Sequence, residues 1–194
     1  MWVVDLTSVR LLFGLIDVRI GAVLDAFTRT IVAIRAHIGE PDAAWTCGLL
    51  RTAVRNARAK PRYVVTDHGV QFTSQLCKAF LRGRGVRHRY GAVGSSAALM
   101  LLERAWRSLK EEFIRHLPLW LSPSSLERRV RAWTEWHAKH RPHQGLGGKT
   151  PEDVRRCRPS RRPLKIGSAD RWILERRDLR NEPLCPVYTL RRAS

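Results

Sequence analysis

The chain has 194 residues, of which 44% are hydrophobic, and its formal net charge is +19. This size suits one domain with a real core. The longest apolar run, Ala97 to Leu102, is too short to span a membrane, which excludes a helical membrane protein. A chain this basic predicts a polyanionic partner, the alternative being a cationic surface that only aids solubility.

The positive charge rises toward the C-terminus. The net charge is +3 over residues 1–60, +4 over 61–103, +6 over 104–149 and +6 over 150–194. Only 6 of the 36 basic residues are lysine, and arginine suits forked contacts with phosphate.

The cysteines point to a reducing compartment. Cys47, Cys77, Cys157 and Cys185 form no CxxC pair, so no ordinary zinc or redox pattern is present. Scattered cysteines indicate reduced thiols, and the first residues, MWVVDLTSVR, lack the form of a signal peptide. We therefore expect a cytoplasmic protein, associated with the nucleoid.

The predicted elements run from strands, through alternating helices and strands, to helices. Strands are expected at residues 2–6, within 9–25, at 29–36, at 63–66 and at 86–90, and helices at 42–58, 74–84, 96–116 and 124–140. Gly14 and Gly21 indicate a hairpin or bulges between the early strands. This order predicts an α/β fold with a mixed sheet and helices packed on it.

Three carboxylates stand at notable positions. Asp67 follows the apolar run Tyr63-Val64-Val65, and an ionised carboxylate at the end of a buried strand is costly unless something binds it. Asp5 also ends an apolar run, and Glu103 lies in the predicted helix LLERAWRSLKEEF. Taken singly, each has an ordinary explanation: a turn former, a turn cap, and an i,i+4 partner of Arg107.

Together, five ordered motifs resemble the catalytic core of DDE integrases and transposases, most nearly the IS3-like transposases. The motifs are WVVDLTSV, VLDAFTRTIV, VVTDHGVQFTS, GAVGSSAALMLLERAWRSLKEEF and WHAKHRPHQGLGGKTPEDV, and 35 residues separate Asp67 from Glu103, the spacing that names the D,D-35-E group. The resemblance implies an RNase H-like fold with a mixed five-stranded sheet flanked by helices. We assign residues 1–150 to this core and 151–194 to a basic C-terminal tail. The tail is expected to be either ordered or disordered in part.

The resemblance also implies the chemistry. Asp5, Asp67 and Glu103 would be the catalytic residues and the ligands of two divalent ions. Carboxylate ligands without cysteine or histidine fit Mg²⁺, or Mn²⁺, rather than zinc. Two such ions activate the attacking oxygen and relieve charge on the leaving oxygen of a phosphodiester.

Basic residues on the glutamate's helix are candidates for DNA contact. Glu103, Arg107 and Lys110 recur at i, i+4 and i+7 and so share one face. We expect Arg107 and Lys110 to contact phosphates near the cleavage point, the alternative being that Arg107 only neutralises Glu103. The neighbouring stripe is apolar and should pack on the sheet: Leu102, Ala105, Trp106, Leu109 and Phe113.

Further DNA contacts are expected on both sides of this helix. His68 and Gln71 follow the second aspartate, where a surface-loop role is equally open. Arg141 belongs to an Arg-Pro-His motif that resembles the RPH motif of the family. Arg161 and Arg162 lie in RRCRPSRRPLK, which would hold DNA through phosphates alone.

Two other patterns are weaker evidence for a functional site. The loop GAVGS, residues 91–95, would lie at the rim of the active site, either as a mobile loop or as a simple connector. His137, His140 and His143 recur every three residues, but no carboxylate or cysteine completes a metal-binding set.

The most favoured function is a metal-dependent DNA strand transferase that frees a 3′-hydroxyl at the element end and joins it to target DNA. The alternatives are a catalytically silent remnant that only binds DNA, and a nuclease acting on RNA–DNA hybrids. The expected partners are transposon ends, target DNA and further copies of the chain. IS3-like transposases usually carry an upstream helix-turn-helix region, and none precedes the first strand here. The resemblance therefore implies a catalytic partner of a separate helix-turn-helix protein that reads the terminal repeats, the alternatives being a truncated copy or an expressed core.

Overall fold

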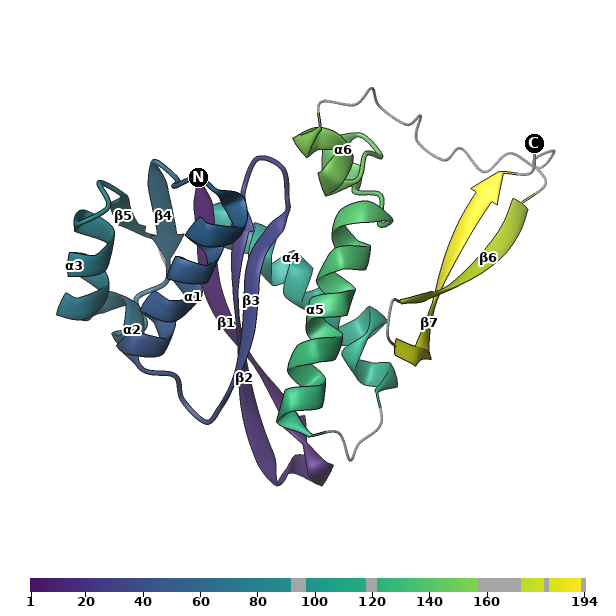
Figure 1. Cartoon of the computed structure of the whole chain (residues 1–194), viewed down its shortest axis with the longest axis horizontal. Coiled ribbons are helices and arrows are strands. Elements are labelled where there is room, and N and C mark those ends of the chain that lie inside the picture. The colour runs from purple at the N-terminus through teal and green to yellow at the C-terminus, as the bar shows by residue number, and fades with distance from the viewer. Residues whose placement is uncertain (92–96, 118–121, 157–171, 180–181, 193–194) are drawn as a thin grey trace. The chain divides into compact units, whose positions relative to one another are not determined.

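The computed structural model describes residues 1–91, 97–117, 122–156, 172–179 and 182–192 (Figure 1). The chain divides into two compact units, residues 1–131 and 132–194. The strands are β1 (Trp2–Leu11), β2 (Ile16–Asp25), β3 (Ile31–Ile38), β4 (Tyr63–Thr66), β5 (Arg87–Tyr90), β6 (Trp172–Leu179) and β7 (Glu182–Arg192). The helices are α1 (Ala43–Ala57), α2 (Val70–Thr73), α3 (Gln75–Arg82), α4 (Ala97–Glu112), α5 (Pro123–Lys139) and α6 (Pro151–Arg155), with short 3-10 turns at Leu12–Gly14, Ile114–His116 and Gln144–Leu146.

The first unit contains the predicted mixed sheet. Its five strands run in the order β3-β2-β1-β4-β5. The β1, β2 and β3 strands pair antiparallel, whereas β4 is parallel to both β1 and β5. The predicted α/β class and five-stranded mixed sheet are therefore confirmed.

The hairpin between β1 and β2 extends further than the sequence predicted. The first strand continues from residue 6 to Leu11, because Thr7, Val9 and Leu11 are buried on alternate positions and pair with β2. The turn contains Gly14 at φ +94°, as the hairpin prediction required. By contrast, Gly21 marks no turn: it lies inside β2, where an added Cβ would meet Leu6 and Trp45 at 2.8 Å.

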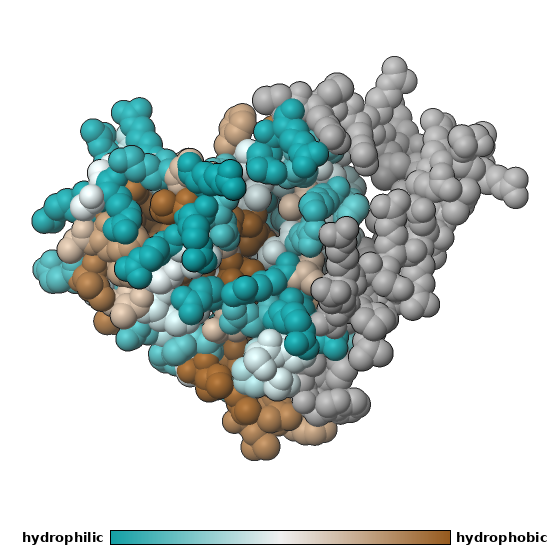
Figure 2. Space-filling model, viewed as in Figure 1, coloured by the Kyte–Doolittle hydropathy of each residue, from teal (hydrophilic) through white to brown (hydrophobic). Residues whose placement is uncertain are grey.

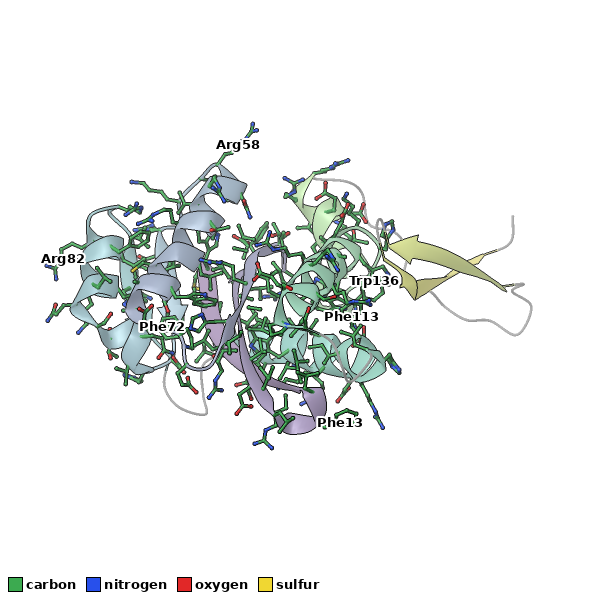
Figure 3. All side chains as sticks on the ribbon, turned by 60° about the horizontal axis from the view of Figure 1, so that its bottom comes forward. Phe13, Arg58, Phe72, Arg82, Phe113 and Trp136 are labelled. Carbon is green, nitrogen blue, oxygen red and sulfur yellow. The ribbon has the colours of Figure 1, made fainter. Side chains whose placement is uncertain are left out.

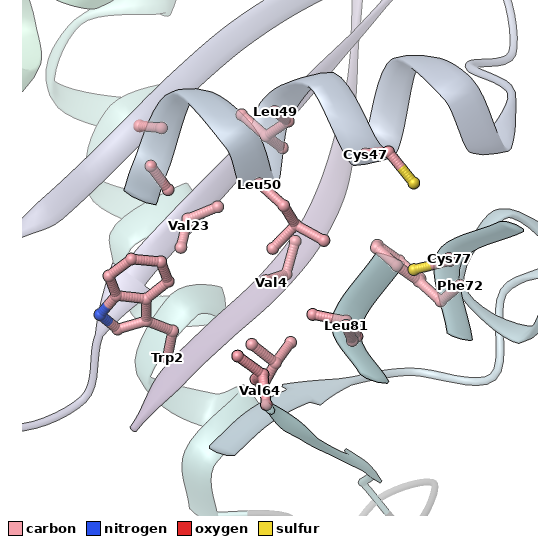
Figure 4. Close-up of a cluster of buried hydrophobic side chains, with 13 residues drawn as sticks. Trp2, Val4, Val23, Cys47, Leu49, Leu50, Val64, Phe72, Cys77 and Leu81 are labelled. Carbon is pink, nitrogen blue, oxygen red and sulfur yellow. The ribbon is translucent and has the colours of Figure 1, made fainter. Parts of the chain in front are cut away.

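The two faces of the sheet have different roles. Side chains from one face of β1 and β4, including Trp2, Val4 and Val64, pack with α1 and α3 in the core cluster of Figure 4. The opposite face carries Val3 and Val65, since successive strand side chains alternate. Helix α4 covers this second face, on the other side of the sheet from α1 (Figure 1).

The tip of the β1–β2 hairpin is apolar and exposed. Phe13 is 78% exposed and Leu15 is 84% exposed. Figure 2 shows hydrophobic side chains at the bottom of the view, where Figure 1 places the end of the β1–β2 hairpin.

The second unit holds two features within the predicted C-terminal tail. Helix α6 starts with a capping box, in which the Thr150 hydroxyl accepts from the Asp153 backbone N–H and the Asp153 carboxylate accepts from the Thr150 N–H. Strands β6 and β7 pair as an antiparallel hairpin, which the sequence analysis did not anticipate. In the described parts of the chain, no helix is long and apolar enough to cross a membrane.

Candidate active site

The two predicted catalytic aspartates lie at neighbouring positions, Asp5 on β1 and Asp67 directly after β4. Trp2 pairs with Val64 and Val3 with Val65, so the same register continued by two residues places Asp5 beside Asp67. Adjacent strands are about 4.8 Å apart. The side chains of both aspartates therefore belong to the face of the sheet that α4 covers.

Trp106 of α4 fixes the Asp5 carboxylate. Its indole Nε1–H donates to Asp5 Oδ2 at 3.0 Å. Burial raises the pKa of Asp5, and the nearby charges of Asp67 and Glu103 raise it further, while hydrogen bonds from the Leu6 backbone and Trp106 act in the opposite direction. Asp5 thus interacts electrostatically with both of the other acids.

The Asp-His-Gly turn after β4 positions Asp67. The Gly69 backbone N–H donates to Asp67 Oδ1 at 3.0 Å, which is the local hydrogen bond that favours aspartate in turns. The predicted contact residue Gln71 lies against this turn, with its amide nitrogen 2.4 Å from where a Cβ on Gly69 would be. Glycine at this position therefore leaves room for Gln71 next to the aspartate.

Neighbouring residues brace the same turn from the other face of the sheet. The Thr66 hydroxyl donates to the Asp67 backbone carbonyl at 2.8 Å and lies 2.9 Å from His88 Nε2. Burial lowers the pKa of His88, which favours the neutral ring. The other predicted contact residue, His68, is stacked on Tyr90 with ring centroids 4.9 Å apart. Sequence reasoning missed Thr66, His88 and Tyr90, although Thr66 immediately precedes the aspartate.

Helix α4 presents the faces that its sequence predicted. All five residues of the expected apolar stripe are buried: Leu102, Ala105, Trp106, Leu109 and Phe113. Glu103, Arg107 and Lys110 are exposed. Trp106 was predicted only to pack on the sheet, and its hydrogen bond to Asp5 is an additional contact. The sequence feature that could have indicated this contact is the position of Trp106 three residues after Glu103, because residues i and i+3 lie on the same side of a helix.

The donor set fits a hard divalent cation by its chemistry. Burial raises the pKa of Asp5, and the nearby charges of Asp67 and Glu103 add to that shift, so a cation placed there would stabilise the ionised carboxylate. Within the described residues, however, no three His, Cys, Asp or Glu side chains are gathered closely enough to form a complete ligand group. The Asp5 and Asp67 carboxylates are each held by a hydrogen bond, and Glu103 faces solvent.

The remaining predicted DNA contacts lie outside the first unit. Arg141 follows α5 and belongs to the second unit. Burial is the main cause that lowers the pKa of His137 to about 3, and the charges of His143 and Arg141 lower it further. The His137 and His143 rings meet edge to face at 4.5 Å. Arg161 and Arg162, and residues 92–95 of the expected rim loop, lie outside the described residues.

A mixed five-stranded sheet with helices on both faces, one aspartate on its central strand and another directly after the neighbouring strand, is the RNase H-like arrangement. Two family models, both described as integrase core domain, match residues 1–96 and 84–151. The matches together span most of the chain, and the chain belongs to the integrase core family.

Solved structures agree on the fold. The catalytic core of HTLV-2 integrase, solved in complex with magnesium, is 18% identical with a TM-score of 0.59, covering 79% of this chain and 93% of that one. The bovine immunodeficiency virus (BIV) integrase core is 16% identical with a TM-score of 0.57, covering 79% and 91%. A chain of the simian T-cell lymphotropic virus intasome with the PP2A subunit B56 gamma is 18% identical with a TM-score of 0.62, covering 88% and 60%. No curated protein matches.

Proposed function

We propose that this chain is the catalytic core of a metal-dependent DNA strand transferase of the transposase and integrase type. The observation that carries the proposal is the convergence of Asp5 and Asp67 on neighbouring strands, with Glu103 near enough to raise the pKa of Asp5. Membership of the integrase core family supports the reaction class.

Asp5, Asp67 and Glu103 would hold two Mg²⁺ or Mn²⁺ ions, which when bound would activate the attacking oxygen and offset charge on the leaving oxygen. The magnesium complex of the HTLV-2 integrase core supports the choice of ion. The protein's own contribution is orientation. Trp106 fixes one oxygen of Asp5, and the Gly69 N–H fixes one oxygen of Asp67.

In the proposed reaction, hydrolysis first frees a 3′-hydroxyl at the donor end. That hydroxyl then attacks a target phosphorus in line, and a new P–O bond forms as the target's own 3′ oxygen leaves. Arg107 and Lys110 would contact phosphates from α4, and His68 and Gln71 would contact them from the turn after β4.

The sequence motifs make transposon ends the proposed donor, as in IS3-like transposases, with a separate helix-turn-helix protein reading the terminal repeats. Related integrase cores were solved in trimeric and dimeric forms, and another belongs to an intasome. These neighbours support self-association of this chain on DNA.

The test is strand nicking and joining on labelled duplex DNA with Mn²⁺ or Mg²⁺, comparing the wild type with Glu103→Gln. Glu111→Gln is the matched control, because Glu111 is an exposed glutamate on the same helix. We expect metal-dependent products from the wild type and the control and none from Glu103→Gln. Products that persist in Glu103→Gln would refute the assignment, and DNA binding without products from any protein would favour the binding-only remnant.

A further inference from the structure

The β4–β5 side of the sheet is unusually basic. Between residues 43 and 102 the chain has ten basic residues and one acidic residue, and that acid is Asp67. None of the ion pairs found in the described part of the chain involves a residue of this segment. The positive charge here is therefore not balanced by neighbouring carboxylates.

Three of these arginines surround one tyrosine. The guanidinium carbons of Arg89, Arg62 and Arg87 lie 4.3, 5.3 and 5.8 Å from the centre of the Tyr63 ring. Arg87 Nη1 also donates to the Tyr63 hydroxyl at 3.3 Å. All three arginines are exposed, so the ring holds guanidinium groups in place while their remaining N–H donors stay available.

We call Tyr63 with Arg62, Arg87 and Arg89 the Tyr63 cluster. Its strand residues Tyr63, Arg87 and Arg89 lie on the face of the sheet that carries Asp5 and Asp67. Tyr63 pairs with Arg87 and Val65 with Arg89, and paired residues of adjacent parallel strands point the same way. Tyr63, Val65 and Asp67 alternate along one strand, so they share that face. By strand geometry, the Cα atom of Arg89 is about 8 Å from that of Asp67.

Opposite strand positions confirm the assignment of faces. His88 and Tyr90, which alternate with the two arginines, are partly buried, and Tyr90 interacts with the buried Cys77 of α3. The arginines therefore lie away from α3. Like-charged groups placed together without counter-ions repel one another, and a bound polyanion would remove that cost.

We propose that the Tyr63 cluster is a second phosphate-binding site, which holds the DNA backbone one to several nucleotides from the phosphate at the carboxylates. This inference rests on the proposed function. Guanidinium forks bind phosphate oxygens bidentately, and the ring of Tyr63 orients them beforehand. DNA over the active site would then be contacted by α4 on one side and by β5 on the other.

The test is duplex binding in EDTA, measured by fluorescence anisotropy over a range of salt concentrations, so that no catalysis is needed. The variant is Arg87→Gln with Arg89→Gln. The control is Arg58→Gln with Arg82→Gln, which removes the same charge from the ends of α1 and α3, where both side chains extend into solvent (Figure 3). Circular dichroism checks that each variant is folded.

We expect the Arg87/Arg89 variant to bind about tenfold more weakly, with the slope of log affinity against log salt reduced by about 1.8. The control should lose less than a third as much. A further variant, Tyr63→Leu, keeps every charge and should weaken binding with the salt slope little changed.

Equal losses in the two double variants would overturn the inference, because bulk charge alone would explain them. So would unchanged binding by the Arg87/Arg89 variant, even if the wild type transfers strands. Conversely, a loss confined to that variant would support the site even in a protein that makes no strand-transfer products.

Discussion

Asp5→Asn should make the protein more stable while abolishing strand transfer. The raised pKa of Asp5 has burial as its main cause, with Asp67 and Glu103 adding like charge. Asparagine has nearly the same shape, and its carbonyl oxygen can still accept from Trp106. The substitution therefore removes the cost of ionising a partly buried group without opening a cavity.

The direction of the pH dependence follows from the sign of the shift. Because the folded-state pKa of Asp5 lies above the unfolded value, the native state keeps a proton that the unfolded chain has lost. Wild-type stability therefore falls as pH rises through the folded-state pKa. The advantage of Asp5→Asn should be absent below the ordinary carboxyl pKa of about 3.9 and fully present above the folded-state value.

We expect the gain at pH 7.5 to be about 0.5–2 kcal/mol, the range typical of a single stabilising substitution. For a chain of this size, that is about 2–4 °C in Tm per kcal/mol. The assay is thermal unfolding followed by circular dichroism in EDTA at pH 4.5 and 7.5. The control, Asp17→Asn, alters an exposed pair with Arg10 and should change stability by less than about 0.5 kcal/mol. A Tm for Asp5→Asn that is lower than wild type, or a gain that is the same at both pH values, would refute the reasoning.

Three further outcomes follow from the same site and its surroundings. Trp106→Phe should raise the pKa of Asp5 and move the acidic limb of the rate profile to higher pH; an unmoved limb would exclude the hydrogen bond from that role. Asp67→Asn should bind DNA several-fold more tightly than wild type in EDTA, because a carboxylate beside phosphate repels it; weaker binding in anisotropy would contradict this. Cys47 and Cys77 should resist alkylation at pH 8 until the protein unfolds, since burial, with the nearby Cys47, raises the pKa of Cys77 to about 12; mass spectrometry of labelled native protein checks it.

Much of the fold could be predicted from local patterns. The apolar stripe of α4, the strand before Asp67 and the Gly14 turn each depend on residues within one element. Hydrophobic period and turn chemistry are local properties, so one sequence reveals them. The three acids were found through motif spacing, and the register of β1 and β4 then places two of them side by side.

What the sequence did not reveal depends on contacts between distant segments. Trp106 and Asp5 are 101 residues apart, and their hydrogen bond arises only when α4 packs on β1. The contact between Thr66 and His88 requires β4 and β5 to pair. The hairpin of β6 and β7 was hidden for another reason: charged residues interrupt its apolar alternation, so composition alone suggested a tail.

The alternation of strand side chains explains how one sheet serves both stability and chemistry. On β1 and β4, Val4 and Val64 enter the core beneath α1 and α3, while Asp5 and Asp67 project to the opposite face. Slipping β4 by one residue would bury Asp67 in the apolar core beneath α1 and α3 and remove Val64 from that core, which is costly on both counts. The packing of one face therefore fixes the position of the carboxylates on the other. A core substitution such as Val64→Ala would then act on the site through strand register, without touching DNA or metal.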